Sequence, residues 1–141
     1  MIATHILVGH DGSRDAETAF EDALDLAALA RARLSIVSVA SAPEPPTEVE
    51  TQAVIESATA HYEKMFESLR RQAKERQVEL RTHIVVGHPA DQILKTAAAH
   101  AVDLIVVGHR GRSAIREWVS GSTSRRIVTH AKCPVLVVRA R

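Results

Sequence analysis

Residues 103–108 read Asp103-Leu104-Ile105-Val106-Val107-Gly108, a run of four aliphatic residues that ends at a glycine. Two more segments, residues 5–9 and residues 134–139, have nearly the same composition. Strands that face water on one side alternate apolar and polar residues, whereas these runs are almost continuously aliphatic. They therefore predict strands of a parallel sheet that is covered on both faces.

Segments with helical periodicity separate these strands. Apolar residues at steps of three and four predict helices at residues 15–31 and at about 48–77, and Pro89 and Gly121 open two shorter ones. Further strands are expected at residues 34–39 and 80–86. Because the strands and helices alternate, the sequence predicts an α/β fold, a doubly wound five-stranded parallel sheet with helices on both faces. We expect residues 1–141 to form a single domain, because no linker divides them.

The composition excludes several classes of protein. Cys133 is the only cysteine, so no internal disulfide is expected. Aromatic residues make up 3% of the chain, which leaves no stacking platform for single-stranded nucleic acid. No apolar run approaches the roughly 20 residues that span a bilayer, and the first residues do not resemble a signal peptide. We therefore expect a cytoplasmic protein that binds neither nucleic acid nor membrane.

Charge is distributed unevenly along the chain. Residues 101–141 hold eight Lys and Arg against two Asp and Glu, although the net charge of the whole chain is only +1. A basic C-terminal segment suits an anionic ligand such as a phosphate, and a solvated basic face is the alternative interpretation.

The strongest motif follows the strand at residues 103–108. It reads Gly108-x2-Gly111-x9-Gly121-Ser122-Thr123. Glycine lets the backbone approach a bulky anion, and the free N–H groups at a helix start bind phosphate. Tight-turn glycines with an ordinary Ser/Thr helix cap are the alternative interpretation.

Other nucleotide and catalytic motifs are absent. The chain has no Gly-x4-Gly-Lys-Ser/Thr, no Gly-x-Gly-x-x-Gly and no recognisable Ser/His/Asp set. Its eight histidines are scattered, without a His-Glu-x-x-His pattern, so a metal site built from histidines is not expected. We assign no catalytic residue.

Taken together, these segments resemble the universal stress protein family over nearly the whole chain. The glycine pattern resembles the nucleotide-binding signature of that family, and residues 6–13, 87–94 and 133–138 resemble its first strand, a Gly-x-Pro helix start and its last strand. The resemblance implies the strand order 3-2-1-4-5. The strands at residues 5–9 and 103–108 are then neighbours, and Asp11 faces the loop that begins at Gly108.

The resemblance also implies a nucleotide site. Asp11 would bind the ribose or a magnesium-linked phosphate, although it could instead cap the first helix. The backbone at Val39 would bind the adenine edge. His10 departs from the family pattern: it could stack or hydrogen-bond near the base, or point to solvent, and nothing fixes the role of His109. The predicted nucleotide-binding residues are Gly9, His10, Asp11, Val39, Gly108, His109, Arg110, Gly111, Gly121, Ser122 and Thr123.

Two functions are therefore expected as alternatives. The first is a stress-response sensor or regulator that binds ATP, AMP or ADP, either alone or together with Mg²⁺. It would hydrolyse ATP slowly at most. The second is a stress-related interaction protein with the same fold and no bound nucleotide. A true nucleotide hydrolase is less favoured, because no general base is evident. The aliphatic edge strand at residues 134–139 and the family resemblance both predict a homodimer.

Overall fold

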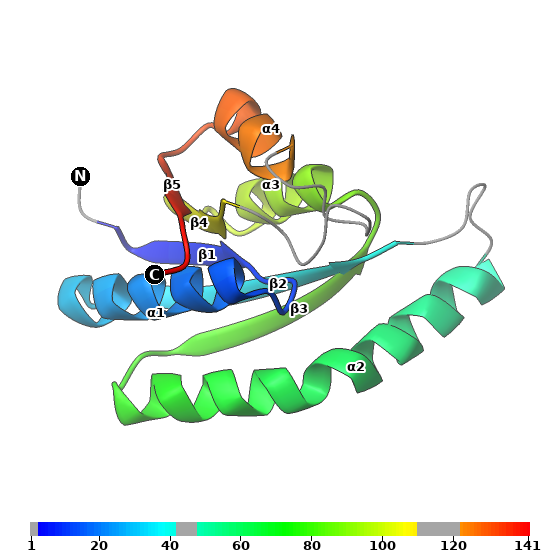
Figure 1. Cartoon of the computed structure of the whole chain (residues 1–141), viewed down its shortest axis with the longest axis horizontal. Helices are drawn as coiled ribbons and strands as arrows, with labels where there is room; N and C mark the ends of the chain where they lie inside the picture. Colours follow the sequence, from blue (N-terminus) through cyan, green and yellow to red (C-terminus); the bar gives the residue numbers. More distant parts are fainter. Residues whose placement is uncertain (1–2, 42–47, 110–121) are drawn as a thin grey trace.

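The computed structural model describes residues 3–41, 48–109 and 122–141. Strands and helices alternate along the chain (Figure 1). In chain order the elements are β1 (His5–Gly9), α1 (Arg14–Ala30), β2 (Arg33–Ala40), α2 (Glu48–Glu75), β3 (Leu80–Val86), α3 (Pro89–Ala99), β4 (Leu104–Gly108), α4 (Ser122–His130) and β5 (Val135–Val138). The predicted strands and helices are all present, with ends that differ from the prediction by one or two residues.

The five strands form one parallel sheet in the order β3-β2-β1-β4-β5. This confirms the predicted fold class and strand order. The chain builds outward from β1 in one direction through β2 and β3, and then in the other through β4 and β5. The order therefore reverses between β1 and β4, whose carboxyl ends meet at Gly9 and Val107.

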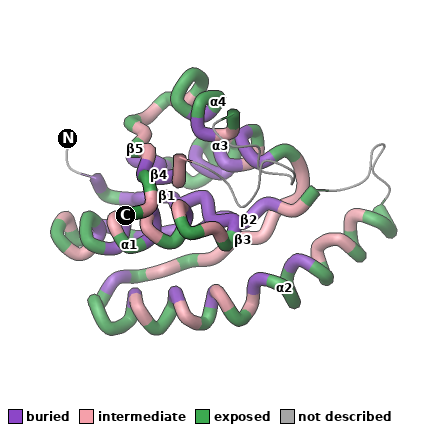
Figure 2. Tube along the Cα trace, in the orientation of Figure 1, coloured by how far each residue is buried: buried purple, intermediate pink, exposed green. Residues whose placement is uncertain are grey.

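Each face of the sheet has its own apolar core. Alternate residues of β1 supply the two cores: Ile6 and Val8 pack against α1 and α2, whereas Leu7 packs against α3 and α4. Figure 2 shows the buried residues gathered along β1 and β2, between the helix layers. Because both faces are covered, the strands can be aliphatic throughout.

Helix α1 begins immediately after the turn that leaves β1. Ser13 is its N-cap residue, and the Ser13 hydroxyl oxygen accepts a 3.1 Å hydrogen bond from the backbone N–H of Ala16. Asp15 and Glu17 lie in the first turn, where acidic side chains interact favourably with the positive end of the helix dipole. This cap fixes the direction in which the chain leaves the β1 end, and so positions the site described next.

Candidate functional site

The carboxyl ends of β2, β1 and β4 lie side by side at one end of the sheet, where the strand order reverses. This carboxyl-end edge is distinct from the outer strands β3 and β5. Hydrogen bonds continue the sheet past the last residue of β1, since the backbone N–H of His10 donates to the carbonyl oxygen of Val37 at 3.0 Å. The hydroxyl of Ser38 donates to the carbonyl oxygen of His10 at 2.7 Å. These two hydrogen bonds to β2 therefore fix the position of the turn that carries Asp11.

Asp11 lies in this turn and is 3% exposed. One of its carboxylate oxygens, Oδ1, accepts a 2.9 Å hydrogen bond from the backbone N–H of Ser13. Gly12 has φ +87°, a conformation that L side chains rarely adopt. Because Ser13 caps α1, the alternative prediction that Asp11 is the N-cap residue is wrong. Asp11 instead shapes a tight turn at the sheet edge.

His10 is fully buried, so the alternative that it points to solvent is wrong. Its ring lies on the α1–α2 face of the sheet, beside Phe20 and Leu69. The ring nitrogen Nδ1 accepts a 3.0 Å hydrogen bond from the backbone N–H of Gly12. Burial lowers the pKa of His10 to about 4, and the nearby Asp11 carboxylate opposes this shift. His10 is thus a neutral, buried side chain that stabilises the Asp11 turn through its hydrogen bond with Gly12.

Gly108 ends β4 beside the first turn of α1. A Cβ atom at Gly108 would lie 2.7 Å from the Cβ of Asp15 and 2.8 Å from its backbone carbonyl carbon. Glycine is therefore required here by the close approach of α1 to the sheet. At Gly9 a Cβ would meet the Cδ1 atom of Ile93 at 2.7 Å. Packing explains why both positions are glycine, in addition to the nucleotide contacts predicted for them.

His109 connects the end of β4 to two other elements. Its backbone N–H donates to the carbonyl oxygen of Val138 in β5 at 2.7 Å. Its carbonyl oxygen accepts a 3.4 Å hydrogen bond from the hydroxyl of Ser124 in α4. The first turn of α4 is therefore fastened directly to the end of β4.

A cavity of about 660 Å³ lies between the starts of α3 and α4. Ser122 and Thr123 line it from α4, as do the guanidinium groups of Arg125 and Arg126. Arg126 is paired with Asp91 of α3, with 2.9 Å between the guanidinium and carboxylate atoms. Asp91 itself lines the cavity, and the remaining lining residues are His88, Pro89, Ala90, Thr129 and His130. Helix N–H groups, hydroxyls and guanidinium groups form a lining that suits an anion.

The other predicted residues occupy different positions. Val39 is 1% exposed, and its side chain belongs to the core under α3. Arg110, Gly111 and Gly121 lie outside the described residues.

Sequence reasoning pointed to the hydroxyl of Ser124 but missed two contributors to this edge: Ser38 and the start of α3 at His88. A hydroxyl within an aliphatic strand was a signal for Ser38, because a buried hydroxyl needs a hydrogen-bond partner. The α3 contribution depends on tertiary packing, since α3 and α4 are far apart in sequence.

Among the described carboxylates at this edge, Asp11 is the one predicted to bind magnesium, whereas Asp15 accepts a hydrogen bond from the backbone N–H of Ala140 and Asp91 is paired with Arg126. Within residues 3–41, 48–109 and 122–141, no group of three or more His, Cys, Asp or Glu side chains is arranged to hold a metal ion. Mg²⁺ commonly binds one or two protein carboxylates together with nucleotide phosphates. The described residues therefore fit a magnesium ion that arrives with a nucleotide, and not one held by protein alone.

Comparison with known proteins identifies the family. Residues 3–139 match the Universal stress protein family. The chain belongs to the universal stress protein family. It is 34% identical over 144 residues to the universal stress protein YxiE of Bacillus subtilis, with 95% of this chain and 97% of YxiE covered.

Solved structures of the family have the same fold. This universal stress protein superposes on UspA from Lactobacillus plantarum with a TM-score of 0.77 and 30% identity, over 96% of this chain and 97% of UspA. A family protein from Arabidopsis thaliana, solved with AMP bound, matches with a TM-score of 0.73 and 21% identity, over 98% and 92% of the two chains. At that identity the second likeness concerns the fold alone. Among the described residues, no helix is both long enough and apolar enough to cross a membrane.

Proposed function

We propose that this universal stress protein binds an adenine nucleotide at the edge where β1 and β4 meet, and acts as a nucleotide-dependent regulator in the stress response. The observation that carries the proposal is the pairing of β1 with β4 where the strand order reverses, with the Asp11 turn following β1 and the start of α4 bonded to the end of β4. Open α/β sheets bind ligands at this position. A family member of the same fold has been solved with AMP bound, which supports an adenine nucleotide.

Different residues would bind the adenine, the ribose and the phosphates. The backbone at Val39 would bind the adenine edge, and Asp11 the ribose or a metal-linked phosphate. Phosphates would lie against the first turn of α4, where Ser122 and Thr123 supply hydroxyls and the positive end of the helix dipole favours an anion. The predicted contacts of Arg110, Gly111 and Gly121 complete this set. His109 would border the phosphates through its backbone, and His10 would position the Asp11 turn.

Magnesium, when bound with the nucleotide, would neutralise phosphate charge. The Asp11 carboxylate would hold it together with phosphate oxygens. The sequence shows no recognisable set of catalytic residues, so we propose binding with at most slow ATP hydrolysis.

Isothermal titration with AMP, ATP and Mg-ATP tests the assignment of Asp11. We expect Asp11→Ala to weaken Mg-ATP binding at least tenfold and AMP binding less, because only the triphosphate complex presents the metal. Asp25→Asn is the matched control: it removes a carboxylate from the far end of α1, where Asp25 pairs with Arg76 at the surface. The control should bind all three ligands like the wild type.

The small-molecule content of purified protein distinguishes the two functions that the sequence left open. Release of AMP, ADP or ATP at close to one per chain after denaturation would support the nucleotide-binding regulator. Absence of nucleotide together with no titration heat for any of the three would instead favour an interaction protein with the same fold.

A further inference from the structure

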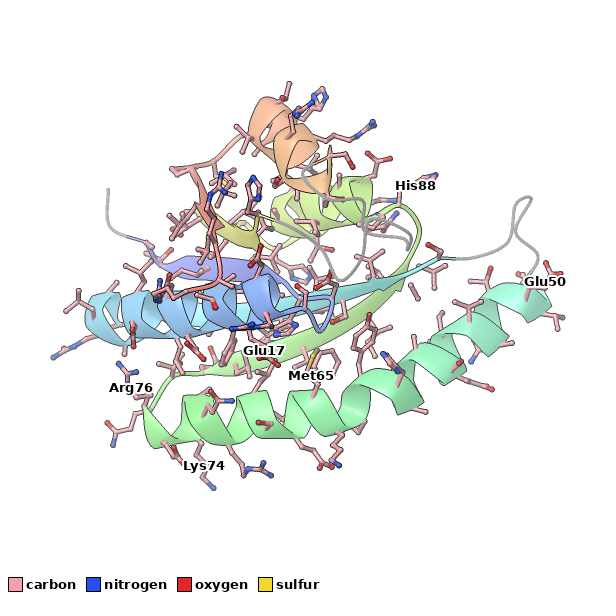
Figure 3. The ribbon with its side chains drawn as sticks, in the orientation of Figure 1. Glu17, Glu50, Met65, Lys74, Arg76 and His88 are labelled. Atoms are coloured by element: carbon pink, nitrogen blue, oxygen red, sulfur yellow. The ribbon has the colours of Figure 1, made fainter. Side chains whose placement is uncertain are left out.

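A second cavity lies on the opposite face of the sheet, between α1 and α2. Its volume is about 420 Å³, within the range of small-molecule sites. Phe20, Met65 and Leu69 form its apolar walls, and His10, which is completely buried, forms its floor. Figure 3 shows Glu17 and Met65 between α1 and α2, at this cavity. We call it the α1–α2 groove.

The floor of the groove carries a buried hydrogen-bond donor. The backbone N–H of Gly12 donates to Nδ1 of His10, so Nδ1 bears no proton. The ring is neutral near pH 7, because burial lowers the pKa of His10 to about 4. Its single proton is therefore on Nε2.

That donor has no partner among the residues that the structure describes. Nε2 of His10 is buried, with no hydrogen bond to any of them. A buried polar group without a partner loses its hydrogen bonds to water and gains none in return, which destabilises the folded chain. An acceptor delivered through the groove would remove that destabilisation.

The mouth of the groove is polar and bears net negative charge. Glu17 and Glu21 lie one helical turn apart on α1, and Lys64 lies across the groove on α2. In the described part of the chain none of these three side chains forms an ion pair. Ser68 and Gln72 complete the rim, joined by a 3.3 Å hydrogen bond. Two unpaired carboxylates favour a cation at the mouth.

We propose that the α1–α2 groove is a second binding site, for a small amphipathic organic cation with a hydrogen-bond acceptor at its buried end. The acceptor meets Nε2–H of His10, the apolar body lies between Phe20 and Met65, and the cation lies at Glu17 and Glu21.

This site is separate from the nucleotide edge. Alternate residues of a strand point to opposite faces, and the ring of His10 follows Ile6 and Val8 to the α1–α2 face. The cavity lined by Ser122 and Thr123 lies between α3 and α4, on the other face. The two ligands would therefore bind at the same time.

A matched set of three probes tests each part of the proposal. 4-(2-Aminoethyl)acetophenone has the acceptor, the apolar body and the cation. 4-Ethylphenethylamine lacks only the acceptor, and 4-ethylacetophenone lacks only the cation. NMR detects binding through the His10 ring nitrogens and the Met65 methyl group. We expect saturable shifts at both residues, with the first probe binding about fivefold more tightly than either of the others.

Variants locate the site. His10→Phe keeps a ring and removes the donor, so the two amines should then bind equally. Ser68→Phe fills the mouth and should abolish binding of all three probes, even where His10→Phe proves too unstable to study. Ser57→Phe, at an exposed position of the same helix, is the control and should bind like the wild type.

Three outcomes would overturn the proposal. One is the absence of saturable shifts at Met65 and His10, which would leave water as the only partner of Nε2–H. Another is equal affinity of the wild type for the probes with and without the acceptor. The third is displacement of the first probe by AMP, which would place both ligands in one site. A protein that binds no nucleotide could still bind the probe, so this test and that of the proposed function can fail independently.

Discussion

The hydroxyl of Ser38 donates a 2.7 Å hydrogen bond to the carbonyl oxygen of His10. Both residues are completely buried, so this bond is shielded from water. It joins the end of β2 to the turn that carries Asp11, and it makes the position of that turn depend on a polar contact inside an aliphatic sheet.

Removal of this hydroxyl should affect both stability and the proposed nucleotide site. We expect Ser38→Ala to lower the free energy of unfolding by about 1–3 kcal/mol, because a buried carbonyl loses its partner. AMP affinity should fall as well, since the Asp11 turn is less firmly held. Urea unfolding and isothermal titration measure the two effects.

Ser35 offers a matched control on the same strand. Its hydroxyl lies 2.7 Å from Nε2 of His5, toward the amino end of the sheet and away from the proposed site. Ser35→Ala should cost a similar free energy of unfolding and leave AMP affinity unchanged. If both variants bind AMP equally well, the Ser38 bond does not position the site.

The two strand-end glycines should differ in their tolerance of a methyl group. At Gly108 the new Cβ would meet the backbone of Asp15 at 2.8 Å, so α1 itself must move. At Gly9 it would meet the end of the Ile93 side chain, which can rotate away. We expect Gly108→Ala to cost about 1–3 kcal/mol and Gly9→Ala clearly less. Urea unfolding of both variants measures the difference, and equal costs would contradict the packing explanation.

Stability should fall as the solution is made acidic, in large part through His10. Its pKa is about 4 in the folded chain and has an ordinary value of 6.5. Between these values the unfolded chain binds a proton that the folded chain does not, so this contribution is complete above pH 6.5 and is lost as pH falls toward 4. The shift corresponds to about 3 kcal/mol. Burial lowers the pKa of His5 and His83 as well, which adds to the same trend.

Urea unfolding between pH 7 and pH 4 measures this dependence. The His10→Phe variant should lose less stability over the range than the wild type, because one of the depressed histidines is gone. Parallel pH profiles for the two proteins would show that His10 is not a neutral buried side chain.

The sequence predicted the sheet well and the site only partly. Continuous aliphatic strands and helical periodicity are local signals, and they were sufficient for the fold class. The face on which the His10 ring lies depends on whether the strand geometry continues one residue past Gly9, which no composition reveals. The sequence Asp-Gly-Ser also allows either Asp11 or Ser13 to cap α1. Only the geometry of the turn shows that Ser13 is the cap. The cavity between α3 and α4 depends on how distant segments pack.

Strand β5 provides the last prediction, which concerns assembly. The strand order places β5 at the edge of the sheet. Leu136 is 37% exposed, and Val135 and Val137 are half-buried. An apolar edge strand with free N–H and C=O groups is an aggregation hazard unless a partner covers it. A second copy of β5, antiparallel across a two-fold axis, would satisfy those groups and bury Leu136.

We therefore expect sedimentation to give a homodimer, twice the mass of the chain. Val137→Lys and Leu136→Lys place a charge in the paired strand and should shift the protein toward monomer; the second variant is informative even where the first disturbs the core beside α4. Leu29→Lys is the control: Leu29 is 85% exposed in the last turn of α1 and is not part of β5, so this variant should leave the dimer intact. A wild-type chain that is monomeric at micromolar concentration would refute pairing through β5, and Arg139 and Arg141 would then be the charges that keep the edge soluble.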